Sequence, residues 1–132
     1  MKQFSFLLIT AMVMVGCKST TNTTPRHFTN SLGMRFVPVP GTEVRFCIWE
    51  TQVKGYAAYA SANKGVNAKW KSPGFVQVDT HPVAKVNWND AQAFCAWLTK
   101  KEQTTGKIKA GQRYRLPTDA EWSVVVGLGK ET

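Results

Sequence analysis

The run 114–122 limits the fold most strongly, because it places a proline directly before a helix-capping pair. Pro117 cannot lie inside a helix, so no helix continues through it from the amino-terminal side. Thr118 and Glu121 have the spacing of a capping box, in which each side chain accepts from the other residue's backbone amide. Gly127 disfavours a long continuation. The run therefore predicts the end of a strand, a turn and a short helix.

Four earlier segments predict three strands and a helix. Residues 43–49 alternate between apolar and polar side chains, which indicates a strand, and 34–39 predicts a second, short strand with prolines at its end. Residues 52–62 predict a helix for which Thr51 supplies the cap. Pro82 begins a brief strand predicted over 82–86.

A second long helix is predicted to begin after Asn87, with Asp90 in the reciprocal capping position. We expect its last turn, around Glu102, to be solvated. Apolar residues recur on one face of this helix, namely Trp88, Ala91, Cys95 and Leu98.

The start of the chain predicts export. Lys2 precedes the apolar stretch 4–15, and Gly16 and Cys17 follow, which is the order of a secretory signal that is too short to span a bilayer. Residues 14–17 resemble a bacterial lipobox, in which the cysteine is lipidated; an ordinary signal peptide with an unmodified cysteine is the alternative. We expect a signal peptide over 1–16, a flexible tether over 17–31, membrane lipid attached through Cys17, and a location in the bacterial cell envelope facing the periplasm or the exterior.

The charge of the chain is strongly positive, with 17 basic and 8 acidic side chains. Nucleic acid is a poor partner, because the predicted signal sends the chain out of the cytosol. The basic residues are scattered, which favours a solvated surface. The alternative is attraction to anionic lipid headgroups or acidic glycans through 64–71 or 100–109.

Few residues suggest chemistry of their own. Cys47 and Cys95 could form a disulfide after export or remain two separate buried thiols. His81 follows Asp79 at a spacing that could orient an imidazole, although a structural junction is the favoured interpretation. Trp70 and Phe75 could form a ligand platform, but we expect them to tuck under their loop. We predict no catalytic, cofactor-binding or metal-binding residue and no cofactor.

Three ordered segments carry a family resemblance: His-Pro-Val at 81–83, the helix 88–98 and the run 114–122. Together they resemble the first half of a formylglycine-generating-enzyme domain, also called the sulfatase-modifying-factor domain, over residues 32–128. The resemblance implies an α+β fold with two main helices and short strands, an irregular relative of the C-type-lectin-like fold. We expect an incomplete domain over 32–132, with Trp88, Trp97 and Trp122 partly exposed.

The resemblance also limits the activity that we expect. In the family, copper and oxygen oxidise a sulfatase cysteine to formylglycine. The copper-binding cysteines, the calcium sites and most of the substrate groove lie in the second half, and no residue here matches them. We therefore predict no catalysis by this chain alone, and a possible protein partner or missing carboxy-terminal half. The alternatives are a non-enzymatic module that binds glycan, peptide or protein, and a gene fragment without function.

Overall fold

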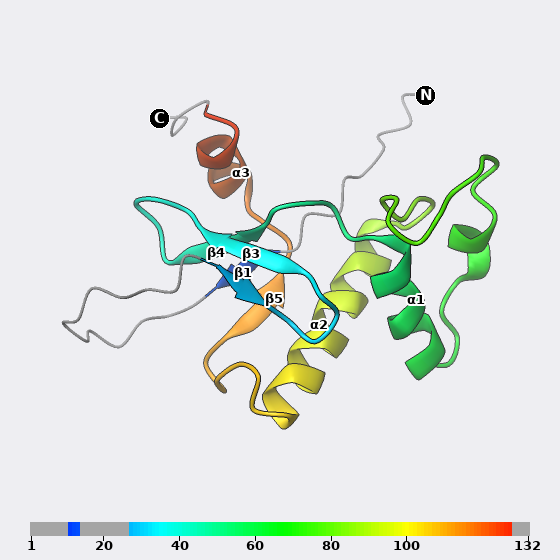
Figure 1. The fold of residues 1–132 in the computed structure, drawn as a ribbon, viewed down its shortest axis with the longest axis horizontal. Coiled ribbons are helices and arrows are strands. Elements are labelled where there is room, and N and C mark those ends of the chain that lie inside the picture. Colours follow the sequence, from blue (N-terminus) through cyan, green and yellow to red (C-terminus); the bar gives the residue numbers. More distant parts are fainter. Residues whose placement is uncertain (1–10, 14–26, 128–132) are drawn as a thin grey trace.

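The computed structural model describes residues 11–13 and 27–127 and has an α+β fold (Figure 1). This confirms the predicted fold class with two main helices. The elements in chain order are strands β1 (Ala11–Val13), β2 (Phe28–Thr29), β3 (Arg35–Pro38) and β4 (Val44–Cys47), helix α1 (Val53–Ala62), the short 3-10 helix η1 (Ala68–Lys71), helix α2 (Trp88–Thr104), strand β5 (Arg113–Arg115) and helix α3 (Asp119–Val125).

The five strands form one antiparallel sheet in the order β2-β3-β4-β1-β5. β1 pairs with β4 on one side and with β5 on the other. This strand lies inside the segment 1–16, for which we predict a signal peptide. The remainder of that segment, Cys17 and most of the predicted tether lie outside the described residues.

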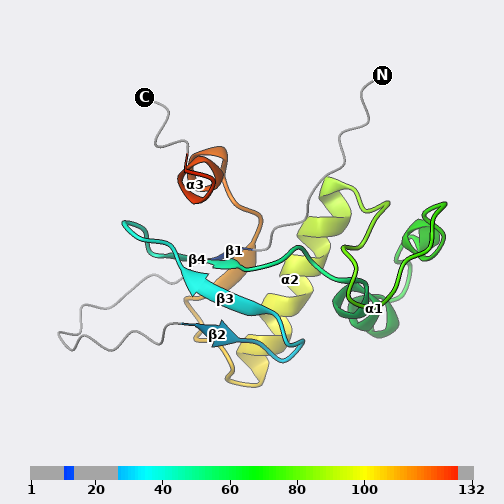
Figure 2. The same ribbon diagram turned by 45° about the horizontal axis from the view of Figure 1, so that its top comes forward.

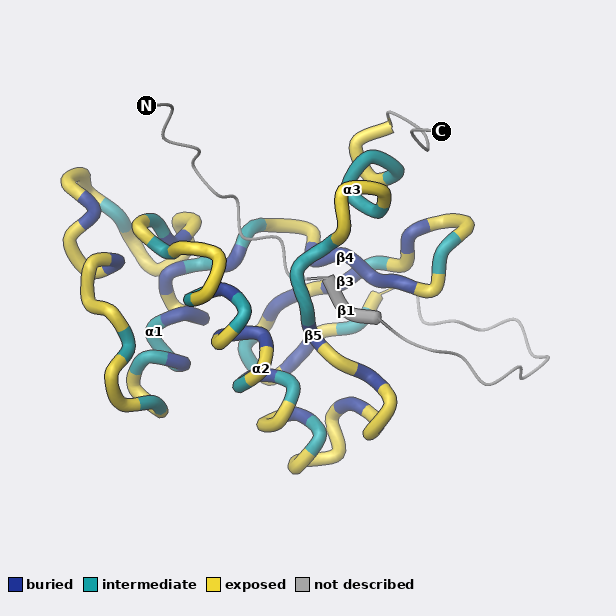
Figure 3. The backbone as a smooth tube through the Cα atoms, turned by 180° about the vertical axis from the view of Figure 1, so that it is seen from behind, coloured by how far each residue is buried: buried dark blue, intermediate teal, exposed yellow. Residues whose placement is uncertain are grey.

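The two faces of β4 serve two separate cores. Val44 and Phe46 pack in a small cluster with Val39, against which Trp122 and Val124 are partly buried. The other face contributes Cys47 to the larger core, which α1 and α2 cover. α3 has no buried residue, and Figures 2 and 3 show it apart from the α1–α2 pair.

Aromatic rings fill the larger core between α1 and α2. The Phe94 ring is fully buried, and its centroid lies 5.9 Å from that of Tyr56 and 5.7 Å from that of Tyr59. Trp70 meets Tyr56 edge to face at 5.5 Å and belongs to this core. Phe75 is 60% exposed, so the prediction that both loop aromatics tuck under their loop is wrong for Phe75.

The two predicted capping boxes are confirmed, while the predicted cap of the first helix is wrong. Asn87 with Asp90 begins α2, and Thr118 with Glu121 begins α3. At α1 the N-cap position is Gln52, which makes no side-chain capping bond. Thr51 is instead fully buried, and its carbonyl accepts from the Val83 amide at 2.9 Å.

The strand predicted over 82–86 is also wrong, since the segment makes only an isolated bridge between Gln52 and Pro82. Pro82 has no amide hydrogen, so it cannot donate to a ladder. The bridge still places this segment beside the start of α1.

The prediction of a solvated helix end over Lys100, Lys101 and Glu102 is wrong for Glu102, whose side chain is fully buried, whereas both lysines are exposed. One carboxylate oxygen, Oε1, accepts from the Ser31 amide at 2.8 Å, and Oε2 accepts from the Tyr114 hydroxyl at 3.3 Å. Burial and the nearby carboxylate raise the pKa of Tyr114, which keeps its hydroxyl protonated as a donor. The carboxylate therefore joins the β2–β3 turn, α2 and β5.

Candidate ligand-binding pocket

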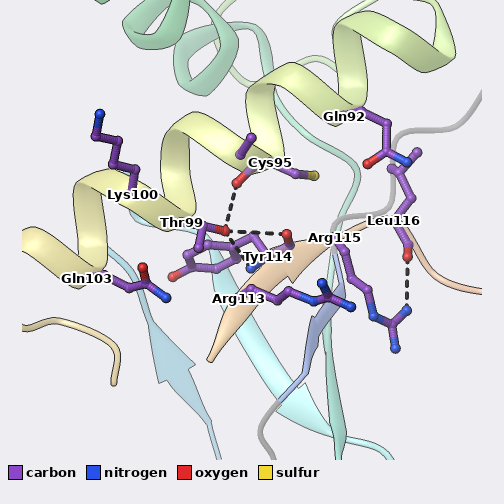
Figure 4. A pocket seen from close by; sticks show the side chains of 10 residues that line it. Gln92, Cys95, Thr99, Lys100, Gln103, Arg113, Tyr114, Arg115 and Leu116 are labelled. Atoms are coloured by element: carbon purple, nitrogen blue, oxygen red, sulfur yellow. Dashed lines mark hydrogen bonds between the residues drawn. The ribbon is translucent and has the colours of Figure 1, made fainter. Parts of the chain in front are cut away.

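A polar pocket of about 520 Å³ lies between α2 and β5 (Figure 4). The periodicity of side chains along a helix and along a strand explains which residues line the pocket from each element. Gln92, Thr99 and Gln103 are seven and four residues apart, which places them near one face of α2. On β5, Arg113 and Arg115 flank the buried Tyr114 and lie on the opposite face of the strand from it. The full lining is Gln92, Cys95, Ala96, Thr99, Lys100, Gln103, Arg113, Tyr114, Arg115 and Leu116.

Thr99 fixes the separation of the two walls. Its hydroxyl donates to the Cys95 carbonyl at 2.8 Å and accepts from the Tyr114 amide at 2.9 Å (Figure 4). The same hydroxyl lies 3.4 Å from the Tyr114 carbonyl. The floor of the pocket is therefore held by hydrogen bonds between side chain and backbone rather than by packing alone.

Three cationic side chains line the pocket and differ in their partners. Arg115 makes a two-point ion pair with Glu121, and its Nη1 donates to Oε2 at 2.7 Å. The bonds from Arg115 hold the pKa of Glu121 down at about 2, and the carboxylate raises the pKa of Arg115. Lys100 and Arg113 are exposed, and within the described residues neither has an ion-pair partner.

This arrangement favours an anionic ligand. Two cations without a described counter-ion face a pocket that also presents the amide side chains of Gln92 and Gln103. Gln103 already donates to the carbonyls of Ala110 and Gln112, both at 2.9 Å. Charge-assisted hydrogen bonds from arginine and lysine to carboxylate or sulfate oxygens are roughly twice as strong as bonds between neutral groups.

Cys47 and His81 lie outside this pocket, whereas Cys95 is part of its lining. Cys47 and Cys95 are buried thiols that are not joined by a disulfide, so the structure has the arrangement with two separate thiols. Burial raises the pKa of the Cys47 thiol. The Nδ1 atom of His81 accepts from the Val78 amide at 3.4 Å, so this ring nitrogen does not donate to the Asp79 carboxylate.

The described residues do not fit the copper that the resemblance implies. Copper in such a site requires accessible thiolates, whereas both thiols here are shielded by the core. No group of three or more His, Cys, Asp and Glu side chains in the described ranges is arranged to hold a metal ion.

Sequence reasoning identified Lys100, within the basic stretch 100–109, but missed the arginines beside it. The signal was available in the alternation of Arg113 and Arg115 around Tyr114, which puts two cations on one side of a strand. The sequence does not show which face of a helix these two arginines would lie against.

The three tryptophans expected to be partly exposed differ among themselves. Trp88 is 53% exposed, while Trp97 and Trp122 are of intermediate burial. Six of the large apolar side chains exposed in the structure lie between residues 48 and 88: Ile48, Trp49, Phe75, Val76, Val78 and Trp88.

Among the described residues, no helix has the length and apolar character needed to cross a bilayer.

Comparison with known proteins confirms the family resemblance. The family model of the sulfatase-modifying factor enzyme 1-like domain matches residues 10–132. The formylglycine-generating enzyme of Mus musculus is 38% identical over 64 residues, which are 45% of this chain and 13% of that protein. The formylglycine-generating enzyme of Bos taurus is 45% identical over 42 residues, which are 32% of this chain and 8% of that protein. No solved structure matches the chain.

Proposed function

Because this chain belongs to the sulfatase-modifying factor enzyme 1-like family, we propose that it is a lipid-anchored envelope protein whose domain binds a ligand and does not catalyse on its own. The lipid is attached at Cys17, after removal of residues 1–16. The matches to the two curated relatives span 13% and 8% of the length of those proteins.

The absence of catalysis is supported by the state of the two thiols. Cys47 and Cys95 are buried, and the raised pKa of Cys47 keeps its sulfur protonated at neutral pH. A protonated, enclosed thiol is a poor nucleophile and a poor copper ligand. Neither residue therefore takes the role of the oxidising centre that the resemblance implies for complete members.

The binding role is carried by one observation, the cationic pocket between α2 and β5. Lys100 and Arg113 are lining residues without an ion-pair partner among the described residues, and Gln92 adds a neutral amide to the lining. Sulfate or carboxylate groups on a sugar satisfy the cations, and sugar hydroxyls satisfy the amide. An acidic glycan of the envelope or of the surroundings is the ligand class that fits both.

A binding experiment with matched variants tests this role. The full chain is titrated with a sulfated glucosamine–uronate hexasaccharide and, in parallel, with neutral maltohexaose. Arg113→Gln removes a pocket cation, and Lys64→Gln removes an exposed cation of the other basic stretch. We expect Arg113→Gln to weaken binding of the sulfated sugar about tenfold, equivalent to about 1.4 kcal/mol, and Lys64→Gln to change it less than twofold. Equal losses for both variants, or equal binding of the neutral sugar, would contradict the proposal.

The anchor is tested separately by fractionation and mass. The wild-type chain should be recovered in the membrane fraction with an amino terminus at Cys17 that carries added acyl mass. Cys17→Ser should not acquire that mass. Recovery of wild-type protein without acyl mass would remove the lipid anchor from the proposal and leave the pocket unaffected.

A further inference from the structure

The centre of the sheet depends on β1, a strand of the chain's extreme amino-terminal part. β1 lies between β4 and β5, and the sheet order gives these two strands no direct pairing. Met12 is opposite Arg45 on β4 and Tyr114 on β5. Ala11 and Val13, on either side of it, are likewise each opposite one residue of β4 and one residue of β5. Removal of β1 would therefore leave β4 and β5 separated by the width of one strand, about twice the 4.7–4.9 Å spacing of neighbouring strands.

The predicted processing removes this strand. β1 lies wholly within residues 1–16, upstream of the proposed mature terminus at Cys17. Loss of the strand would leave the inward-facing amides and carbonyls of β4 and β5 without their ladder partners. Those groups lie among the buried residues Val44, Phe46 and Tyr114. Buried backbone groups without partners are strongly disfavoured, so such a gap would favour a replacement strand.

We propose that processing at Cys17 vacates the β1 position and that the processed protein accepts there an extended segment of a partner polypeptide. This is strand addition within a sheet rather than at its outer edge, so both sides of the incoming segment find ladder partners. The inference rests on the proposed processing and does not require the glycan pocket, although the two share Arg113.

The neighbours of the position define the chemistry of the partner segment. Its middle residue is opposite the buried Tyr114, on the face that packs toward the larger core, and is therefore apolar. Its flanking residues lie on the other face; one is opposite Phe46 and Arg115, and the other is opposite Val44 and Arg113. Arg115 is already paired with Glu121, so the first of these residues is apolar, while an acidic residue opposite Arg113 would form a cross-strand pair of opposite charge. The partner therefore presents an extended segment with an apolar centre, an apolar residue on one side and an acidic residue on the other.

The state of the mature amino terminus is the first measurement. Intact-mass analysis of protein recovered from cells decides between a chain that starts at Cys17 and one that retains residues 1–16. A retained segment overturns both the processing and the vacated position. A terminus at Cys17 supports the processing and leaves the strand position to the second measurement.

The second measurement uses a labelled peptide on the processed protein. The peptide has the sequence Thr-Ala-Met-Glu-Thr, in which Ala-Met reproduces Ala11 and Met12 and the glutamate takes the position opposite Arg113. A control peptide has proline in place of methionine, because proline lacks the amide hydrogen that a central strand must donate to one neighbour or the other. The unprocessed chain, made by translation in vitro, is the matched protein control, since its own β1 occupies the position.

We expect saturable binding of the methionine peptide to the processed protein, at least tenfold weaker binding of the proline peptide, and no binding of either peptide to the unprocessed chain. Hydrogen exchange of the β4 and β5 amides should slow when the methionine peptide binds. Equal affinity for the two peptides, or no binding, overturns the strand-addition inference alone. Amides in the peptide-free processed protein that exchange as slowly as those in the unprocessed chain overturn it too, because the sheet would then have closed over the gap.

Discussion

Replacing Glu121 by glutamine should make the stability of the chain less dependent on pH. The bonds from Arg115 hold the pKa of Glu121 at about 2, below its ordinary 4.5. A lowered carboxylate pKa contributes stability that is fully present above about pH 4.5 and is lost as the pH falls toward 2. The ion pair is also the main polar link from β5 to α3, which has no buried residue of its own.

The expected magnitude follows from that shift. Each unit corresponds to about 1.4 kcal/mol, so the shift sets an upper bound of about 3 kcal/mol. The two side chains are 21% and 17% exposed, and solvent screening therefore reduces the expected loss to about 1–2 kcal/mol at pH 7. At pH 3 less than half of this difference should remain, because Glu121 in the unfolded chain is then already almost fully protonated.

Urea unfolding of the full chain followed by circular dichroism, at several values between pH 3 and pH 7, measures this difference. Glu121→Gln is suited to the test, because glutamine can still cap the amide of Thr118 while the charge is lost. Asp119→Asn removes a neighbouring exposed carboxylate from the same helical turn and serves as the control, with a loss below about 1 kcal/mol. A difference between wild type and Glu121→Gln that stays constant from pH 3 to pH 7 would refute the assignment of the shift to this ion pair.

Substitutions at three further positions test the larger core, the buried network and the cap of α2 by thermal or urea unfolding. Glu102→Ala should cost about 2–4 kcal/mol, because the Ser31 amide and the Tyr114 hydroxyl lose their acceptor, and Glu102→Gln should cost less than half of that; similar losses for both would contradict the buried network. Asn87→Ala should lower stability by about 1 kcal/mol through loss of the cap of α2, and an unchanged midpoint would argue against that cap. Phe94→Ala should cost about 3–5 kcal/mol and Phe94→Leu distinctly less, and a tolerated alanine would show that this fully buried ring does not support the core.

The starts of α2 and α3 could be predicted from the sequence because their capping interactions are local. Asn87 with Asp90, and Thr118 with Glu121, lie three residues apart and make their reciprocal bonds without help from the remainder of the chain. The same holds for the alternation that predicts β4. The resemblance carried the fold class further, since it rests on three such segments in a fixed order.

Interactions between distant residues were decided only by the tertiary structure. The sequence predicts that Glu102 lies at a solvated helix end, yet its carboxylate accepts from the Ser31 amide, which is 71 residues away. The sequence predicts Thr51 as a helix cap, but its carbonyl accepts a hydrogen bond from the Val83 amide and its side chain is buried. A local pattern cannot show which element will cover a given side chain.

The candidate site divides in the same way. The sequence determined that Arg113 and Arg115 share a side of a short strand, and that Gln92, Thr99 and Gln103 lie near one face of a helix. Only the tertiary structure brought these two surfaces together, through the hydrogen bonds of Thr99 to α2 and β5. Periodicity fixes the directions of side chains within an element, whereas packing between elements fixes which of those directions meet.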